Sequence, residues 1–336
     1  MTPTVRRSLA IATMCLGLNA VAQTHYSVQH ISQPSELSNC FVTSLDSKGR
    51  VGGGGINTTA GSYDGFVTKS AGKGLKPLQE PGPYGEVFGV YINDNGLVAV
   101  GGYAYSHAYL TDVNGSFVTD LTSVLHDNMA TLYAVNNAGL VVGSRGSAQS
   151  RGTVFLLDAA TMAITEIASI GVPSAISDHG VVVGTDWYAH QAFVAPPPYS
   201  TAYSIQPIWA ASSKAMAVNK KSEVVGSYVA ASSGQTRPFI GKGTQLFTEL
   251  QVPGALDAEA TGINIASTIV GNFTDPITGN KGAFRCSGDC SDFVDLDTLA
   301  TLPHDAHIEA AKAINKAGQI LVQGSNAKFY LLSPES

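Results

Sequence analysis

Several short stretches carry residue types that catalysis or metal binding uses. The stretch HDAH places His304 and His307 three residues apart, but no acidic ligand completes a zinc pattern such as HExxH. The stretch GSYDG has Tyr63 where the nucleophile elbow GxSxG needs serine. Acid pairs for glycoside hydrolysis can come from segments far apart in the chain, and Asp178, Asp186 and Glu86 are the candidates. These patterns predict no catalytic residue, no metal site and no cofactor.

Amphipathic aromatic residues gather in the segments that vary most in length. Rings among Asn, Ser and Thr suit either sugar stacking or a hot spot for a protein partner. The alternative is that the rings only pack the loops down. The candidate ligand-binding residues are Trp187, Tyr188, Trp209, Tyr103, Tyr105 and Tyr84.

The stretch CSGDC contains Cys286 and Cys290. In an oxidising compartment these residues can close a local disulfide across the tip of a hairpin. A CxxxC metal or redox pair is the alternative. No second Cys or His pair lies nearby at ligand spacing, so the disulfide is favoured. Cys40, beside FVTSL, is expected to be a small buried hydrophobic residue.

The elements that would position these residues come from a repeat. Seven units align on a polar turn such as NDNG, NNAG or SDHG, and the steps between units run from 41 to 51 residues. This period is typical of propellers and solenoid arrays. The aligned turn residues are Asp46, Asn93, Asn136, Ser177, Asn219, Asn264 and Asn315.

Each unit contains four short segments that predict strands. A segment ends at the polar turn, a β-branched segment such as LVVG follows, a third carries an aromatic residue, and a fourth alternates polar and apolar residues. Four hairpin-linked strands make one propeller blade, so we expect an all-β, seven-bladed β-propeller. The last unit lacks its fourth segment, and HYSVQHI near the N-terminus matches it. The N-terminal strand would therefore complete the last blade and close the ring, which an open solenoid would not need.

Two columns of the repeat have competing interpretations. One aromatic residue per unit is most simply a packing layer between blades, with a ring of ligand-stacking side chains as the alternative. This column is Phe66, Tyr109, Phe155, Phe193, Phe239, Phe284 and Phe329. The Asn column resembles fragments of a calcium loop, but most turns hold at most one acid. Hydrogen bonds from Asn side chains to the local backbone explain the column better.

The stretches INDNGLVAVGGYAYSHAYL, VNNAGLVVG and ISDHGVVVGTDWYAHQAF resemble the HAF repeat of bacterial extracellular proteins. The resemblance covers nearly all of the chain after residue 22. It departs from the family pattern at the His, which is present as His107 but is replaced by Thr153, Gln191, Arg237 or Gly282 in other units. The resemblance implies export and a repeated β fold, and it implies no known reaction.

The N-terminal segment has the pattern of a signal peptide. Arg6 and Arg7 precede an apolar run from Leu9 to Leu18, and a small-residue site ends at Ala22. We expect residues 1–22 to be a signal peptide and 23–336 a single propeller domain. Met14 before Cys15 argues against a lipoprotein signal, so the expected destination is the periplasm or the medium. The apolar run is too short to span a bilayer, and no other segment is long enough.

The composition narrows the function classes. A net charge of −6 with scattered lysines and arginines argues against nucleic-acid binding, which needs a concentrated basic surface. We predict an exported monomeric binding module without catalysis, with a glycan or protein ligand on the loop-rich face of the propeller. The alternatives are a propeller enzyme acting on polysaccharide (a hydrolase or lyase) and a periplasmic inhibitor or immunity-type protein.

Overall fold

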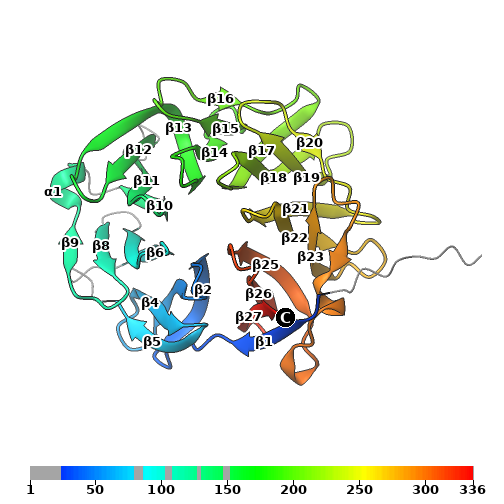
Figure 1. Ribbon diagram of the computed structural model, residues 1–336, viewed down its shortest axis with the longest axis horizontal. Helices are drawn as coiled ribbons and strands as arrows, with labels where there is room; N and C mark the ends of the chain where they lie inside the picture. Colours follow the sequence, from blue (N-terminus) through cyan, green and yellow to red (C-terminus); the bar gives the residue numbers. More distant parts are fainter. Residues whose placement is uncertain (1–23, 79–85, 103–107, 127–129, 147–151, 336) are drawn as a thin grey trace, which may run out of the picture.

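In the computed structural model, the seven repeats form seven blades around a central axis (Figure 1). The structure describes residues 24–78, 86–102, 108–126, 130–146 and 152–335. The predicted signal peptide, residues 1–22, lies outside these residues. None of the helices in the described part has the length and hydropathy of a transmembrane span.

The strands follow the chain blade by blade from the centre outwards. Blade 1 has β2 (Leu37–Leu45), β3 (Val51–Asn57), β4 (Tyr63–Ser70) and β5 (Lys73–Pro77). Blade 2 has β6 (Val87–Ile92), β7 (Leu97–Gly102), β8 (Tyr109–Asp112) and β9 (Val118–Asp120), followed by the one-turn helix α1 (Thr122–Leu125). Blades 3 and 4 are β10 (Thr131–Val135), β11 (Leu140–Arg145), β12 (Thr153–Asp158), β13 (Ile164–Ile176), β14 (Val182–Asp186), β15 (Ala192–Ala195) and β16 (Tyr203–Ser204).

Blade 5 has β17 (Ala210–Val218), β18 (Glu223–Ala230), β19 (Thr236–Lys242) and β20 (Thr248–Glu249). Blade 6 has β21 (Asp257–Ile263), β22 (Thr268–Thr274), β23 (Lys281–Ser287) and β24 (Val294–Asp295), followed by two 3-10 turns, η1 (Leu296–Thr298) and η2 (Pro303–Asp305). Blade 7 has β25 (Ile308–Ile314), β26 (Ile320–Gly324), β27 (Phe329–Pro334) and β1 (Tyr26–His30).

The prediction of seven four-stranded antiparallel blades is confirmed, with one refinement. Strand β13 is continuous: its first part pairs with β12 as the outer strand of blade 3, and its second part pairs with β14 as the inner strand of blade 4. Blades 3 and 4 therefore share one seven-stranded sheet. Between Ile170 and Pro173 the sequence has one residue that favours turns, Gly171, and the strand continues through it.

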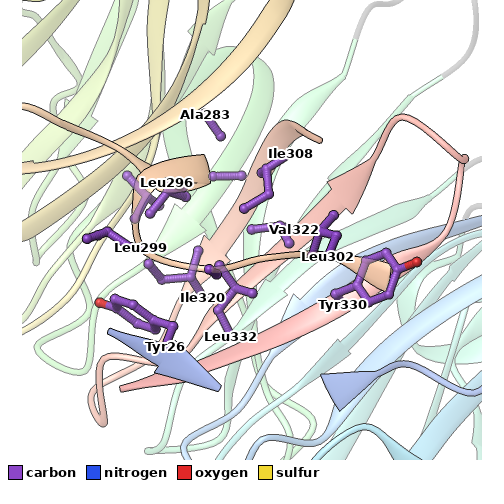
Figure 2. Close-up of a cluster of buried hydrophobic side chains, with 13 residues drawn as sticks. Tyr26, Ala283, Leu296, Leu299, Leu302, Ile308, Ile320, Val322, Tyr330 and Leu332 are labelled. Atoms are coloured by element: carbon purple, nitrogen blue, oxygen red, sulfur yellow. The ribbon is translucent and has the colours of Figure 1, made fainter. Parts of the chain in front are cut away.

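The predicted ring closure is also confirmed. Strand β1 pairs antiparallel with β27 along its whole length, from Tyr26 opposite Pro334 to His30 opposite Tyr330. The Tyr26 ring lies within the apolar cluster between blades 6 and 7 (Figure 2). The backbone N–H of Tyr26 donates to the Leu299 carbonyl at 3.0 Å. The N-terminal strand thus covers an edge that would otherwise expose unpaired backbone groups.

The core is divided among the seams between blades. The buried apolar side chains form seven clusters, and each cluster joins two consecutive blades, including blade 7 with blade 1. All seven members of the aromatic column are buried within these clusters, which confirms the packing interpretation. In several blades, a glycine on the second strand faces the side-chain ring of the aromatic column. A Cβ on Gly143 would lie 2.5 Å from Cζ of Phe155. Close approach of the ring therefore explains the final glycine of the VVG pattern.

The polar turns hold each first hairpin and also link neighbouring blades. In Asn136, Oδ1 accepts from the N–H groups of Ala138 and Leu140, as the local interpretation predicts. Its Nδ2 donates to the Ser177 carbonyl of the next blade at 2.9 Å, a contact that the sequence did not predict. Asn93, Asn219, Asn264 and Asn315 make the same bond to the next turn. We call this set of five inter-blade bonds the asparagine ladder.

Candidate functional site

The alternation of hairpins gives the ring two different faces. The turns between first and second strands lie on one side, which we call the turn face. The connections between second and third strands, and those between blades, lie on the other side, which we call the loop face. The cavities described below are lined by strand ends and connections of the loop face. This agrees with the expectation that variable loops on a rigid scaffold carry binding.

Trp209 occupies one of these cavities, beside blade 5. It lies in the connection that enters β17, and its side chain is about half exposed, at 50%. The cavity has a volume of about 510 Å³. Its other walls come from the end of β18, the start of β19 and Glu249 in β20. Trp209, in the connection that enters β17, therefore shares this cavity with residues of β18, β19 and β20.

Aromatic neighbours hold the Trp209 ring in place. It meets the Tyr228 ring edge-on at 5.0 Å between centroids, and the Phe247 ring edge-on at 6.1 Å. Phe247 in turn stacks on Phe239 of the buried aromatic column at 4.1 Å. The chain of rings anchors Trp209 to the core of the blade, which reduces the entropy that a ligand would lose in ordering it.

Polar groups surround the indole. The Tyr228 hydroxyl donates to Oε2 of Glu249 at 2.5 Å, and Nη2 of Arg237 donates to Oε1 of Gln235 at 2.5 Å. Burial, together with the bond to Glu249 and its charge, raises the pKa of Tyr228 above its ordinary value. The tyrosine is protonated at neutral pH, but Glu249 accepts its only proton, so the donors left at this site include the remaining N–H groups of Arg237. A ring face bordered by fixed donors and acceptors can bind a flat ligand that carries hydroxyl groups.

Trp187 and Tyr188 are not among the described residues that line this cavity. Trp187 and Tyr188 lie in the loop between β14 and β15 of blade 4 and are 49% and 60% exposed. That loop is held by Asp186, whose Oδ1 accepts from the N–H groups of Tyr188 and Ala189. Tyr84, Tyr103 and Tyr105 lie outside the described residues.

A second cavity on the loop face, of about 460 Å³, lies at the seam of blades 1 and 2. Its walls are mainly apolar and include Phe41, Tyr63 and Phe88, with Glu86 at the same site. Tyr63 is therefore part of a ring-lined hollow and not of a nucleophile elbow. A third cavity is lined by residues of blades 5, 6 and 7, and most of these residues are charged or polar.

The candidate acids for hydrolysis do not converge. Asp178 lies in the turn after β13, on the turn face, where its carboxylate accepts from the backbone and side chain of Asn137. Asp186 and Glu86 belong to the loop face, in blades 4 and 2. Within the described ranges, no three His, Cys, Asp or Glu side chains are grouped as metal ligands. His304 is exposed in the connection before β25, and His307 is partly exposed there.

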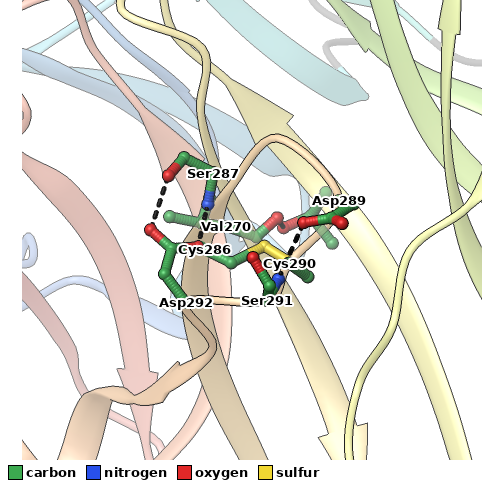
Figure 3. Close-up of a disulfide and its surroundings, with 8 residues drawn as sticks. Val270, Cys286, Ser287, Asp289, Cys290, Ser291 and Asp292 are labelled. Carbon is green, nitrogen blue, oxygen red and sulfur yellow. Dashed lines mark hydrogen bonds between the residues drawn. A yellow bond between two sulfur atoms is a disulfide. The ribbon is translucent and has the colours of Figure 1, made fainter.

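The predicted disulfide is present at the tip of the β23–β24 hairpin (Figure 3). The Cα atoms of Cys286 and Cys290 are 4.9 Å apart, and both residues are buried in the seam between blades 5 and 6. Ser287 supports the turn by donating from its N–H to Oδ1 of Asp292 at 2.7 Å. Cys40 is a free thiol that is only half buried, so the expectation of a buried residue holds in part. Burial raises the pKa of its thiol.

Comparisons with known proteins agree on the architecture alone. No family model matches the chain, and no curated protein matches its sequence. Among solved structures, it is similar to a catalytically inactive virginiamycin B lyase from Staphylococcus aureus with Quinupristin, at 13% identity and a TM-score of 0.60 over 92% of this chain and 99% of that one. It is also similar to YCF48 bound to D1 peptide, at 11% identity and a TM-score of 0.58 over 97% and 100% of the two chains.

A third similar structure is the β-propeller domain of the Trilobed protease from Pyrococcus furiosus. It is 7% identical, with a TM-score of 0.58 over 88% of this chain and 95% of that domain. Identities this low establish the seven-bladed fold and nothing about chemistry.

Proposed function

We propose that this protein is an exported binding module that takes a saccharide on the loop face, with Trp209 as the stacking platform. The observation that carries the proposal is the half-exposed indole of Trp209 inside a cavity of about 510 Å³, braced by Tyr228 and bordered by Glu249 and Gln235. A pyranose ring has an apolar face of C–H groups and a rim of hydroxyls. The first fits an aromatic face, and the second fits fixed donors and acceptors.

Both a sequence pattern and a disulfide support the export of this protein. The signal-peptide pattern of residues 1–22 and the resemblance to the HAF repeat of bacterial extracellular proteins suggest a protein that leaves the cytoplasm. The Cys286–Cys290 disulfide suits an oxidising compartment. The solved structures with Quinupristin and with D1 peptide illustrate that propellers of this size hold ligands, although neither ligand is carried over to this chain.

The test compares two tryptophan variants on a glycan array, followed by titration calorimetry of each hit. Trp209→Ala removes the platform, whereas Trp187→Ala removes a tryptophan of nearly equal exposure in a different blade and serves as the matched control. We expect Trp209→Ala to weaken binding tenfold or more, since a stacking ring contributes about 1.5 kcal/mol and each 1.4 kcal/mol is about tenfold. Trp187→Ala should bind like the parent protein.

Thermal unfolding of both variants tests whether a loss of glycan affinity comes from misfolding. Equal affinity of the two variants for a bound glycan would contradict the placement of the site at Trp209. An array on which the parent protein binds no glycan would contradict the saccharide class itself.

A further inference from the structure

The third cavity of the loop face is lined mainly by charged and polar side chains. It has a volume of about 360 Å³ and lies where blades 5, 6 and 7 meet. Its charged residues come from three strands of blades 6 and 7. They are Asp257 and Glu259 in β21, Lys281 in β23, and Glu309 and Lys312 in β25.

The carboxylates of this cavity already have donors within the protein. Oδ1 of Asp257 accepts from the Thr236 N–H at 2.6 Å, and Oε1 of Glu259 accepts from the Asn272 amide at 3.0 Å. Glu309 lies 3.8 Å from the imidazole of His307. Each acid therefore has one of its oxygens engaged, and its second oxygen remains available to a hydroxyl group.

The lysines of the cavity are in a different situation. Among the residues that the structure describes, the ion pairs are Asp46–Arg50, Arg145–Glu166, His307–Glu309 and Asp94–Lys316, so neither Lys281 nor Lys312 has a carboxylate at ion-pair distance. Both lysines are exposed, although local desolvation of the Lys312 ammonium group is the largest influence on its pKa and lowers it. The charges of Glu259 and Glu309 oppose this shift, whereas that of Lys281 adds to it. An anion placed between the two lysines would relieve their repulsion.

The charged cavity adjoins the Trp209 site through three consecutive residues. Gln235 and Arg237 line the Trp209 cavity, while Thr236 between them lines the charged one. Successive side chains of a strand point to opposite sides, so the start of β19 forms the wall common to both cavities. Arg237 ties this wall to blade 6 by donating from Nη1 to the Ala255 carbonyl at 3.2 Å.

We propose that the charged cavity is a second subsite, which takes a carboxylate-bearing sugar residue of an acidic oligosaccharide that extends from the Trp209 platform. Lys281 and Lys312 bind the carboxylate, and the free oxygens of Asp257 and Glu259 accept from the sugar hydroxyls. This inference rests on the proposed saccharide function and names the class of saccharide. Three carboxylates against two lysines give the cavity a net negative charge, so the preference for a carboxylate depends on direct contact with Lys281 and Lys312, and a simple anion without hydroxyls should not bind.

The test uses pairs of oligosaccharides that differ only in charge. Oligogalacturonate, oligomannuronate and hyaluronan oligosaccharides are each titrated beside their carboxyl-reduced forms, and a sulfated galactan is titrated beside its desulfated form. We expect at least one carboxylated ligand to bind about tenfold more tightly than its reduced form. Lys281→Met and Lys312→Met should each remove most of this difference, measured as the ratio of the two dissociation constants. Lys73→Met, at an exposed position in blade 1, is the matched control.

Each result separates the subsite from the platform. If reduced forms bind through Trp209 but no acidic form binds more tightly, the subsite is wrong and the saccharide function stands. A preference that survives both lysine variants also overturns the subsite. A preference for the sulfated galactan alone would overturn the carboxylate assignment. If no form binds to the parent protein, the saccharide function fails, and the subsite fails with it.

Discussion

Asn315 donates from Nδ2 to the main-chain carbonyl of Asp46 at 2.8 Å, across 269 positions of the sequence. This bond joins the turn of the last repeat to that of the first, so the asparagine ladder passes through the seam where the ring closes. A second closure, between β1 and β27, lies at the outer edge of the same blade. The ring is therefore fastened at its inner turns and at its outer strands.

One rung of the ladder can be tested at Asn136. Asn136→Ala removes the donor to the Ser177 carbonyl and the acceptor of two backbone N–H groups. Because the residue is buried, we expect the free energy of unfolding to fall by about 2 to 3 kcal/mol. Urea unfolding measures the change. Asn136→Ser keeps a local acceptor, as Ser177 does in its own turn, and loses the donor, so it should lose less stability than Asn136→Ala. An Asn136→Ala variant as stable as the parent would show that the rung contributes nothing.

The ladder is interrupted between blades 4 and 5, where Ser177 replaces asparagine. Its hydroxyl accepts from the Val181 N–H at 3.1 Å, but it is too short to reach the Asn219 turn as an amide does. Ser177→Asn should supply the missing rung and raise the free energy of unfolding by about 1 kcal/mol. Ser177→Ala removes the local bond without adding a rung and should be destabilising. A Ser177→Asn protein that unfolds at a lower urea concentration than the parent would contradict this prediction.

Blade 1 has Asp46 where most other blades have asparagine, and the Asp46 carboxylate cannot donate a hydrogen bond to the next blade. Arg50 takes over the link: Nη2 donates to the Asn93 carbonyl at 3.3 Å, and Nε pairs with the buried Asp46 carboxylate. Blades 2 and 3 have Leu97 and Leu140 in the position of Arg50, whereas blade 5 has Glu223 there. The repeat therefore predicts that an asparagine and a leucine could replace this ion pair.

Arg50→Leu should lower the free energy of unfolding by about 3 to 5 kcal/mol, since it leaves the Asp46 carboxylate buried without a counter-charge. The double variant Asp46→Asn, Arg50→Leu should recover most of this loss, because it recreates the arrangement of blades 2 and 3. A double-mutant cycle by urea unfolding measures the coupling. If the double variant is no more stable than Arg50→Leu, then the asparagine at position 46 does not form the rung.

The repeat predicted the architecture from one sequence because each blade restates the same pattern. Seven polar turns, seven β-branched strands and a missing last strand determine the number of blades and the closure together. The ladder was not predicted, because the turn residues alone do not show which blade lies beside which turn. Its signal was present in retrospect: the first turn, which lacks an amide, has an arginine four residues later.

The candidate site could be predicted only in part. Trp209 was identified because a tryptophan in a variable loop is visible in the sequence. Tyr228 and Glu249 were missed because they lie on regular strands and reach Trp209 only when blade 5 folds. Lys281 and Lys312 were missed for a similar reason, since they come from two blades and share a cavity only in the closed ring.

The turn face carries a charged pair whose effect depends on pH. Lys316 in blade 7 reaches Asp94 in blade 2, with Nζ 2.8 Å from Oδ2. Partial burial alone would raise the pKa of Asp94, but the hydrogen bonds from Lys316 and Ser47 outweigh it and hold this pKa below its ordinary value. A carboxyl group with a depressed pKa stabilises the fold above its unfolded pKa of about 4, and the contribution is lost as the pH falls through the folded value.

Lys316→Met should therefore lower the urea midpoint at pH 7, and this deficit should shrink as the pH falls and Asp94 becomes protonated. Lys220→Met is the matched control, since Lys220 holds the same turn position in blade 5 and forms none of the ion pairs found in the described part of the chain. Its midpoint should follow that of the parent at every pH. The measurement is a series of urea titrations from pH 7 to pH 2. A Lys316→Met deficit that is as large at pH 2 as at pH 7 would mean that the lysine acts through packing of its aliphatic chain and not through the Asp94 carboxylate.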